Sequence, residues 1–447
     1  MNGPAFQTAG TGFFPRDSLD FSAGRISEET PPTTGKVPSE QSTEPDELPG
    51  LYIHIPFCLR KCAYCGFYSI IDRSLIPAFL SALRREMDLY RGWAASFDTL
   101  YIGGGTPSVL TAADLEGLIA DLLDAFTITA DAEVTVEVNP GDITPGLLAS
   151  LRRSGVNRLN IGVQSFDDDS LALLGRRHTA LQASGAFLQA SDAGFVNIGL
   201  DLIYGLPSFP AGGGTATVTG GTKPPSSPAG GATSTKADRP FATWLATLDR
   251  AIGLNPDHLS CYQLTLEDKT PLAERCHRGE LVLPDESRQA DLFLRTSEIL
   301  EESGYIHYEV SNFARPGRES RHNRKYWNHV PYLGLGPAAH SFSGRERRWN
   351  RSSVDAYTGD LESGREPIES REILSDEQLR LEALFLGFRT RRGICLETFR
   401  IRYGRDLLAD KRDMIERLSK EGLVEIRDGF LRPTRAGMAV ADSLALI

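Results

Sequence analysis

The chain has 447 residues, of which 40% are hydrophobic and 24% are charged, an ordinary composition for a globular protein. Its 48 Lys and Arg residues against 59 Asp and Glu residues give a formal net charge of −11, which makes nucleic acid an unfavourable partner. No run of about 18 apolar residues is present, and this excludes a membrane-spanning helix.

The first 48 residues differ in composition from the rest. Residues 1–48 are rich in Thr, Pro, Ser, Gly and Glu and have no apolar periodicity, which predicts a disordered tail. They lack the apolar stretch of a secretory signal, and their acidic residues outnumber the basic ones, unlike those of a mitochondrial transit peptide. The six cysteines lack the dense spacing of a disulfide scaffold. We therefore expect a cytoplasmic protein with reduced thiols.

Residues 49–265 alternate between short apolar runs and amphipathic stretches. Apolar runs predict strands at 51–55, 99–102, 133–138, 158–163, 196–204 and 258–263. Apolar residues at three- and four-residue spacing predict helices at 75–90, 112–125, 144–154, 181–193 and 241–252. Six βα repeats imply a parallel sheet but are too few for an eight-fold barrel. The predicted fold is a partial (β/α)6 TIM-like barrel, with its chemistry at the carboxyl ends of the strands.

Three further regions are distinguished by composition. Residues 208–240 are a Gly-, Pro-, Ser- and Thr-rich insertion that we expect to be disordered. Residues 266–370 are mixed and are expected to complete the barrel. Residues 371–447 predict helices at 377–389, 396–402 and 407–421, a hairpin around Asp428-Gly429, and a last helix from Thr434. This pattern favours a winged-helix-like α+β domain, and DNA binding through its arginines is a minor alternative that the acidic net charge opposes.

Three cysteines follow the first predicted strand. Cys58, Cys62 and Cys65 are spaced by four and three residues, so a loop can bring their thiolates to one metal centre. Zinc sites usually close four ligands, whereas three thiolates on a cubane cluster leave one iron open to an exogenous ligand. Soft thiolates favour iron–sulfur or zinc over hard cations. We predict that these cysteines hold a 4Fe–4S cluster.

The CxxxCxxC pattern after the first strand of a six-repeat βα unit resembles the radical S-adenosylmethionine (SAM) superfamily. The resemblance implies that the amino and carboxylate groups of SAM chelate the open iron. It also implies that an electron from the cluster can cleave a carbon–sulfur bond of SAM to give a 5′-deoxyadenosyl radical.

Further residues resemble the SAM cradle of the coproporphyrinogen-oxidase-like branch. Taken singly, each could instead make a salt bridge or a core hydrogen bond. The resemblance implies a contact with the SAM amino group for the glycine-rich segment after the second strand and a carboxylate partner for Arg176, and we expect Asp201 to accept from a ribose hydroxyl. We expect His54 either to face the site or to be packed. His340 is a weaker candidate for contact with heme or SAM, and a packed histidine is the favoured alternative. The implied SAM-binding residues are Tyr52, Gly104, Gly105, Thr106, Glu137, Gln164, Arg176 and Asp201.

Two groups share this branch: oxygen-independent coproporphyrinogen III oxidases and HemW-type heme chaperones. The oxidases carry a fourth cysteine two positions after the third, where this chain has Phe67. Residues 322–327 match the HNxxYW motif of HemW-type proteins, which implies heme binding by His322, Asn323, Tyr326 and Trp327. A His nitrogen can ligate heme iron and the two aromatic rings can stack on the macrocycle. Nearby Arg321, Arg324 and Lys325 could pair with the heme propionates.

The resemblance therefore predicts a heme chaperone rather than an enzyme, with no residue assigned as catalytic. It would pass heme to apoproteins, including membrane-bound respiratory enzymes, from the cytoplasm and peripherally at the inner face of the membrane. An electron donor or heme donor and a homodimer are further expected partners. The alternative is a coproporphyrinogen III oxidase or another radical SAM enzyme acting on a tetrapyrrole.

Overall fold

The computed structural model describes residues 47–210 and 239–446. Most of the predicted tail at 1–48 and of the predicted insertion at 208–240 lies outside the described residues. None of the helices in the described parts of the chain has the length and apolarity needed to cross a membrane.

Six parallel strands alternate with helices, which confirms the predicted βα pattern. The strands are β1 (Gly50–Ile55), β2 (Phe97–Gly104), β3 (Ile128–Val138), β4 (Arg158–Gln164), β5 (Ile198–Tyr204) and β6 (His258–Gln263). The helices between them are α2 (Ile76–Leu89), α3 (Ala112–Ala125), α4 (Pro145–Arg153), the short α5 (Asp168–Leu173), α6 (Ala180–Asp192) and α7 (Arg239–Leu254).

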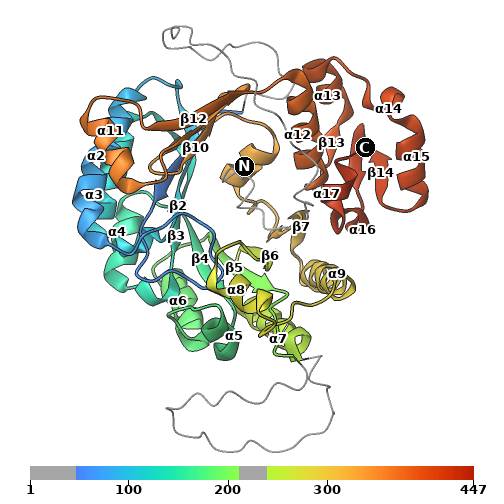
Figure 1. Cartoon of the computed structure of the whole chain (residues 1–447), viewed down its shortest axis with the longest axis horizontal. Helices are drawn as coiled ribbons and strands as arrows, with labels where there is room; N and C mark the ends of the chain where they lie inside the picture. The colour runs from blue at the N-terminus through green and yellow to red at the C-terminus, as the bar shows by residue number, and fades with distance from the viewer. Residues whose placement is uncertain (1–46, 211–238, 447) are drawn as a thin grey trace, which may run out of the picture.

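Residues 266–370 extend this sheet at both edges. The twelve strands follow the order β12-β11-β10-β9-β1-β2-β3-β4-β5-β6-β8-β7, so both ends of the sheet are open. Figure 1 shows α2, α3, α4 and α6 along the outside of the curved sheet. This is the partial barrel that the repeats predict. The added elements are α8 (Pro271–His277), α9 (Glu286–Glu302), β7 (Ile306–Glu309), β8 (Asn312–Ala314), α10 (Arg321–Trp327), β9 (Tyr332–Leu335), β10 (His340–Phe342), β11 (Glu346–Asn350), α11 (Val354–Glu362) and β12 (Ile368–Ile373).

Alternation along the strands divides an apolar core from a polar interior. In β1 the side chains of Leu51, Ile53 and Ile55 are fully buried in the large apolar core, whereas those of Tyr52 and His54 point to the other face. Three of the helices that cover the apolar face, α3, α4 and α6, start at capping threonines, as at Thr111, whose side chain accepts a hydrogen bond from the Asp114 amide. The inner face is therefore left to polar side chains.

The C-terminal region forms a separate small core. It contains α12 (Asp376–Phe388), β13 (Ile394–Cys395), α13 (Leu396–Tyr403), α14 (Leu407–Asp410), α15 (Arg412–Lys420), β14 (Val424–Arg427), β15 (Phe430–Pro433), α16 (Arg435–Met438) and α17 (Ala441–Leu444). The hairpin is confirmed, and Asp428 and Gly429 have the positive φ values of 51° and 79° that a tight turn of this kind needs.

Two helix breaks and one short strand in this region differ from the prediction. The single helix predicted at 407–421 is wrong, because Lys411 leaves the helical conformation (φ −124°, ψ 21°) and separates α14 from α15. The last helix is likewise broken at Val440. The two-residue β13, which pairs with β15, is too short to give a periodic signal.

A buried ion pair joins the C-terminal region to the sheet. The Arg389 Nη2 atom lies 2.8 Å from the Glu309 Oε1 atom, and the two side chains are 2% and 0% exposed. The backbone amide of Val310 donates to the Arg389 carbonyl, and that of Arg391 donates to the Tyr308 carbonyl. These contacts hold the C-terminal region beside β7 (Figure 1).

Candidate functional site

A cavity of about 280 Å³ lies inside the curved sheet. It extends from the cysteine loop, at the carboxyl ends of the parallel strands, to α10, which lies near their amino ends. All the cluster, SAM and heme residues predicted from the sequence line this cavity, with the exception of Trp327. The structure therefore brings these residues together from five strands, β1 to β5, from the segments that follow them and from α10.

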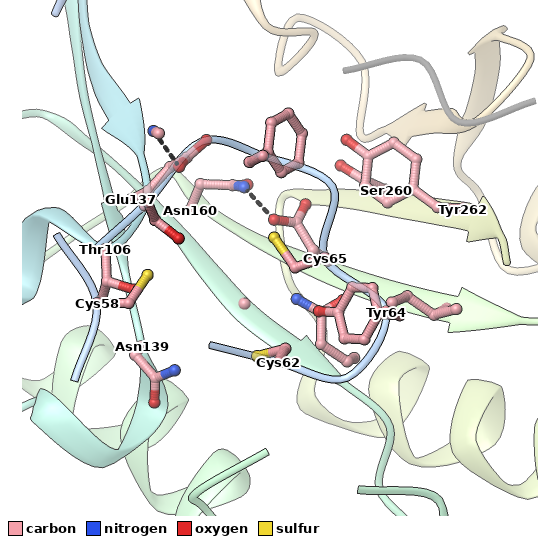
Figure 2. A pocket seen from close by; sticks show the side chains of 18 of the residues that line it. Cys58, Cys62, Tyr64, Cys65, Thr106, Glu137, Asn139, Asn160, Ser260 and Tyr262 are labelled. Atoms are coloured by element: carbon pink, nitrogen blue, oxygen red, sulfur yellow. Dashed lines mark hydrogen bonds between the residues drawn. The ribbon is translucent and has the colours of Figure 1, made fainter. Parts of the chain in front are cut away.

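The three motif cysteines lie on one loop that starts directly after β1. The amide of Cys58 donates to the Ile70 carbonyl, which closes the base of the loop, and the amide of Cys65 donates to the Cys62 carbonyl in a tight turn. All three are free thiols, and Figure 2 shows their sulfur atoms arranged around the cavity.

This arrangement suits a cluster better than a single ion. Within the described residues, no three His, Cys, Asp or Glu side chains are grouped closely enough to hold one metal ion. The three cysteines of a 4Fe–4S cluster each bind a different iron, so they need not meet at one point. The residues present therefore fit the predicted cluster.

Neighbouring side chains act directly on the sulfur atoms. Arg176 Nη1 donates to the Cys62 sulfur at 3.3 Å, and the Thr106 hydroxyl lies 3.4 Å from the Cys58 sulfur. Burial raises the pKa of Cys65 to about 11. A bound cation reverses that effect, because a metal-bound thiol is deprotonated.

The glycine-rich segment after β2 fits against the cysteine loop. Gly104 has a φ of 109°, and a Cβ atom there would lie 2.7 Å from the His54 ring. A Cβ atom at Gly105 would lie 2.7 Å from the Phe57 carbonyl oxygen. The glycines thus allow close packing between protein segments, in addition to the approach to a ligand that the sequence suggests. His54 is packed and 4% exposed, with hydrogen bonds to the Tyr52 hydroxyl and the Tyr68 carbonyl.

Two buried carboxylates lie on the inner face of the sheet. Glu137 accepts hydrogen bonds from the Tyr101 hydroxyl at 2.7 Å and from the Gly104 amide at 3.2 Å. Asp201 accepts from the Asn160 amide group at 2.6 Å, a contact drawn in Figure 2. Burial, with Asp201 as a second cause, raises the pKa of Glu137 to about 7. Burial also raises the pKa of Asp201.

Gln164 and Arg176 converge above Gly162. Gln164 ends β4 at a bulge in its pairing with β5 and has a φ of 68°, which turns its side chain toward the cavity. A Cβ atom at Gly162 would lie 3.1 Å from Gln164 Nε2 and 3.3 Å from Arg176 Nη2. The glycine therefore leaves room for both side chains.

Buried polar atoms without partners test whether SAM fits. Asp201 Oδ1, Asn160 Oδ1 and Arg176 Nε are buried and have no hydrogen-bond partner among the described residues. Buried polar groups are rarely left unpaired, because each costs about 1–3 kcal/mol. The free acceptors match ribose hydroxyls and an amino group, and the free donor matches a carboxylate. The cavity therefore fits SAM in chemistry.

The floor of the cavity is formed by α10. The Glu133 carboxylate accepts from the backbone amides of Arg321 and His322, both at 3.0 Å, and so anchors the start of this helix. His322 is 1% exposed, and its ring nitrogens hydrogen-bond to the Thr99 hydroxyl at 2.8 Å and to the Tyr326 hydroxyl at 2.9 Å. Burial lowers the pKa of His322 to about 3. A neutral imidazole with both nitrogens engaged holds α10 in place.

The remaining heme residues do not lie together. Asn323 lines the cavity with His322 and Tyr326, whereas Trp327 packs edge-on against Tyr308 outside it, with ring centroids 5.8 Å apart. Tyr326 and Trp327 therefore do not face one macrocycle in this structure. They are successive residues of a helix, and such side chains point about 100° apart.

The expected basic partners of the propionates are mostly engaged elsewhere. Lys325 is 3% exposed and its Nζ atom lies 2.7 Å from Asp98 Oδ1, and Arg321 pairs with the same carboxylate. Arg324 is exposed. His340 stacks on Trp349 and does not line the cavity.

Several lining residues were missed by the sequence analysis. They come from the inner faces of β2, β4 and β6 and share a polar side chain at alternate strand positions. The alternation within 158–164 and 258–263 was the available signal. These residues are Tyr101, Arg158, Asn160, Ser260 and Tyr262.

Comparisons with known proteins agree with this architecture. Residues 52–211 match the family model of the radical SAM superfamily, and residues 374–440 match that of the HemN C-terminal domain. The chain is 33% identical over 416 residues to the heme chaperone HemW of Mycobacterium tuberculosis, covering 90% of this chain and 97% of that protein. It is 36% identical to the heme chaperone HemW of Lactococcus lactis, covering 78% of this chain and 83% of that protein.

One solved structure has the same overall fold. The radical SAM enzyme coproporphyrinogen III oxidase (HemN) of Escherichia coli superposes with a TM-score of 0.72 at 24% identity, covering 90% of this chain and 91% of that one.

Proposed function

The chain belongs to the HemW family within the radical SAM superfamily, and from that membership we propose that it is a heme chaperone, which binds heme and passes it to an apoprotein. The observation that carries this proposal is similarity to HemW over almost the full length of a relative, 97% in the first comparison above. Further support comes from the sequence, which has Phe67 at the position where the related oxidases have a fourth cysteine.

We propose that Cys58, Cys62 and Cys65 hold the 4Fe–4S cluster and that the cavity beside it holds SAM. When bound, the cluster supplies one electron at a time and an open iron for SAM. Arg176 lies between the two sites, since it donates to the Cys62 sulfur and to the Gly162 carbonyl, and its Nε atom is left for a carboxylate. Asn160 orients Asp201 so that one carboxylate oxygen is left for a hydroxyl.

We propose that the segment 322–327 holds heme, as the HNxxYW resemblance implies. Its support in the structure is that α10 is fixed firmly, by Glu133 at its start and by the Lys325–Asp98 pair near its end. A fixed helix presents its remaining side chains without a large ordering cost.

We further propose that the acceptors are respiratory apoproteins and that transfer occurs in the cytoplasm at the inner face of the membrane. Six free cysteines are consistent with a reducing compartment. A homodimer stays a prediction of the resemblance, to be checked by sedimentation with and without SAM.

One observation favours a second candidate, a radical SAM enzyme acting on a tetrapyrrole. The unpartnered atoms of Asp201, Asn160 and Arg176 form a SAM-binding surface that simple heme transfer does not require. This candidate predicts conversion of SAM to 5′-deoxyadenosine with a tetrapyrrole present.

The test begins with anaerobic purification and reconstitution of the cluster. Heme is then titrated and the Soret band followed, and transfer is measured to a purified heme-free respiratory cytochrome. Saturable binding followed by transfer is the expected result. Decarboxylation of coproporphyrinogen III with consumption of SAM would contradict the chaperone and support the enzyme.

A further inference from the structure

A second cavity, of about 480 Å³, lies between α10 and the C-terminal region. We name it the domain cleft. Its walls come from β7 and α10 on one side, and from the segment 390–395, α13 and β15 on the other. Because the Arg389–Glu309 ion pair and the paired backbone segments join these two sides, the cleft is a fixed feature of the fold.

Aromatic rings from both sides enter the domain cleft. Trp327 and Tyr308 meet edge to face from the barrel side, and Phe399 and Tyr403 pack with centroids 5.0 Å apart on the other. The Phe430 ring, on β15, also lines the cleft. Such rings offer flat apolar surface together with polar edges, which suits a flat aromatic ligand.

Positive charge is concentrated in the same cleft. Five arginines line it, namely Arg324, Arg391, Arg392, Arg402 and Arg432, against the single carboxylate of Glu319. This is opposite to the chain as a whole, whose formal net charge is −11. A local excess of guanidinium groups attracts carboxylates and phosphates, which they can bind in a bidentate fashion.

The arginines of the domain cleft differ in how far acidic neighbours neutralise them. Arg391 pairs with Glu301 at 2.6 Å, and Arg432 pairs loosely with Asp428 at 3.7 Å. In the described parts of the chain, no acidic partner lies within salt-bridge distance of Arg324 or Arg402. Arg432 Nε is also buried without a hydrogen-bond partner. These donors are available to an anionic ligand.

We infer that the domain cleft is the heme site, where the macrocycle packs among the aromatic rings on the Trp327 side of α10 and its carboxylates pair with Arg324, Arg402 and Arg432. This inference rests on the proposed function and specifies its location. It assigns His322 a positioning role, holding α10 from the opposite side.

The barrel cavity is less suited to the same ligand. It is lined by five basic side chains, those of Arg60, Lys61, Arg158, Arg176 and Arg177, against the three carboxylates of Glu137, Asp201 and Glu267, so its excess of positive charge is smaller than that of the domain cleft. Both ring nitrogens of His322 are also engaged. A dicarboxylate ligand is therefore favoured in the domain cleft on charge.

The experiment compares variants of the full-length, cluster-loaded protein in heme titrations. The double variant Arg324→Gln, Arg402→Gln should raise the Kd at least tenfold, as should Trp327→Ala. The matched control is Arg400→Gln, since Arg400 lies on the same helix as the cleft residue Arg402 but outside the cleft and pairs with Glu397. This control should bind heme within twofold of the parent. Because both cleft arginines are exposed, their replacement should leave folding and iron content unchanged.

A second probe, heme dimethyl ester, isolates the carboxylates. The parent should bind the ester about tenfold more weakly than heme, and the double arginine variant should bind the ester as the parent does. If the parent binds heme and the cleft variants bind it equally well, the inference is overturned while the proposed function stands. If the parent binds no heme, both fall. Binding of acidic acceptor peptides that depends on these arginines, with unchanged heme affinity, would identify the cleft as a protein-docking site and overturn the inference.

Discussion

The barrel cavity and the domain cleft lie on opposite sides of α10 and are built on different principles. The cavity is lined by residues whose positions follow from strand register and from glycines that allow close contact, and its inner face holds buried carboxylates. The cleft is formed between two separately packed regions and is rich in arginine and aromatic side chains. A site built within one sheet leaves motifs in the sequence, whereas a site built between regions becomes visible only after folding.

The largest difference between the two sites is expected when a cluster ligand is removed, since only the barrel site should then be lost. Cys62→Ala should reduce the bound iron to background, because a cubane cluster needs its three thiolates. Heme affinity in the domain cleft should stay within twofold of the parent. Iron analysis and the visible absorption spectrum measure the first effect, and Cys276→Ala, outside both sites, is the control. A Cys62→Ala protein with full iron content would refute the ligand assignment.

Disrupting the Arg389–Glu309 ion pair, which joins the C-terminal region to the sheet, should affect the domain cleft and leave the barrel cavity intact. Arg389→Ala leaves the Glu309 carboxylate buried without its cation, which should cost about 3–5 kcal/mol of unfolding free energy. Urea unfolding and limited proteolysis would show release of the C-terminal region. Loss of heme binding with retained iron is expected. Arg405→Ala removes an exposed pair with Asp410 and should cost less than about 1 kcal/mol. Equal effects of the two variants would contradict this reading.

Two glycines with positive φ test how tightly each region is packed. Gly104→Ala combines an unfavourable backbone conformation with a Cβ atom 2.7 Å from the His54 ring, and should cost about 3 kcal/mol. Gly429→Ala in the C-terminal hairpin meets no atom within 4 Å and should cost about 1 kcal/mol, from the backbone alone. Thermal unfolding measures both. A larger loss of stability for Gly429→Ala than for Gly104→Ala would show that the barrel interior is packed less tightly than the C-terminal region.

A smaller expected effect is on the pH dependence of stability. A carboxylate of the barrel cavity should contribute to it, whereas the arginines of the domain cleft should not. The pKa of Glu137 is raised to about 7, whereas the pKa of a free Glu is about 4.3. Between these values the folded state binds more protons than the unfolded state, so stability falls as the pH rises, by at most about 1.4 kcal/mol per pH unit. Glu137→Gln should remove that part of the slope in the ligand-free protein, measured by urea unfolding from pH 4 to pH 8.

A second carboxyl provides the control for this measurement. Glu86, outside both sites, has a pKa that burial also raises to about 7, and it should leave a similar slope in the Glu137→Gln protein. A slope unchanged by Glu137→Gln would mean that Glu137 titrates normally. Neutralising Arg402 in the domain cleft should leave the slope unchanged, because arginine does not titrate in this range.

Much of the barrel could be predicted because each βα unit carries its own periodicity. The strand bearing Gly162 and Gln164, and the loop bearing the three cysteines, follow from apolar runs and motif spacing. The bulge that turns Gln164 inward depends on pairing with β5, which no local pattern reports. The split between Tyr326 and Trp327 could have been expected from the helical repeat, but the cleft that receives Trp327 requires residues about 55–105 positions later in the chain.

The short length of α10 has a consequence for how the two ligands influence each other. This seven-residue helix has His322 and Tyr326 against one compartment and Arg324 and Trp327 against the other. Any tilt that one occupant imposes on it must reshape the opposite chamber. If such a tilt occurs, thermodynamic reciprocity requires that SAM change heme affinity by the same factor by which heme changes SAM affinity. About two turns of helix would then link the loading and release of heme to the supply of SAM.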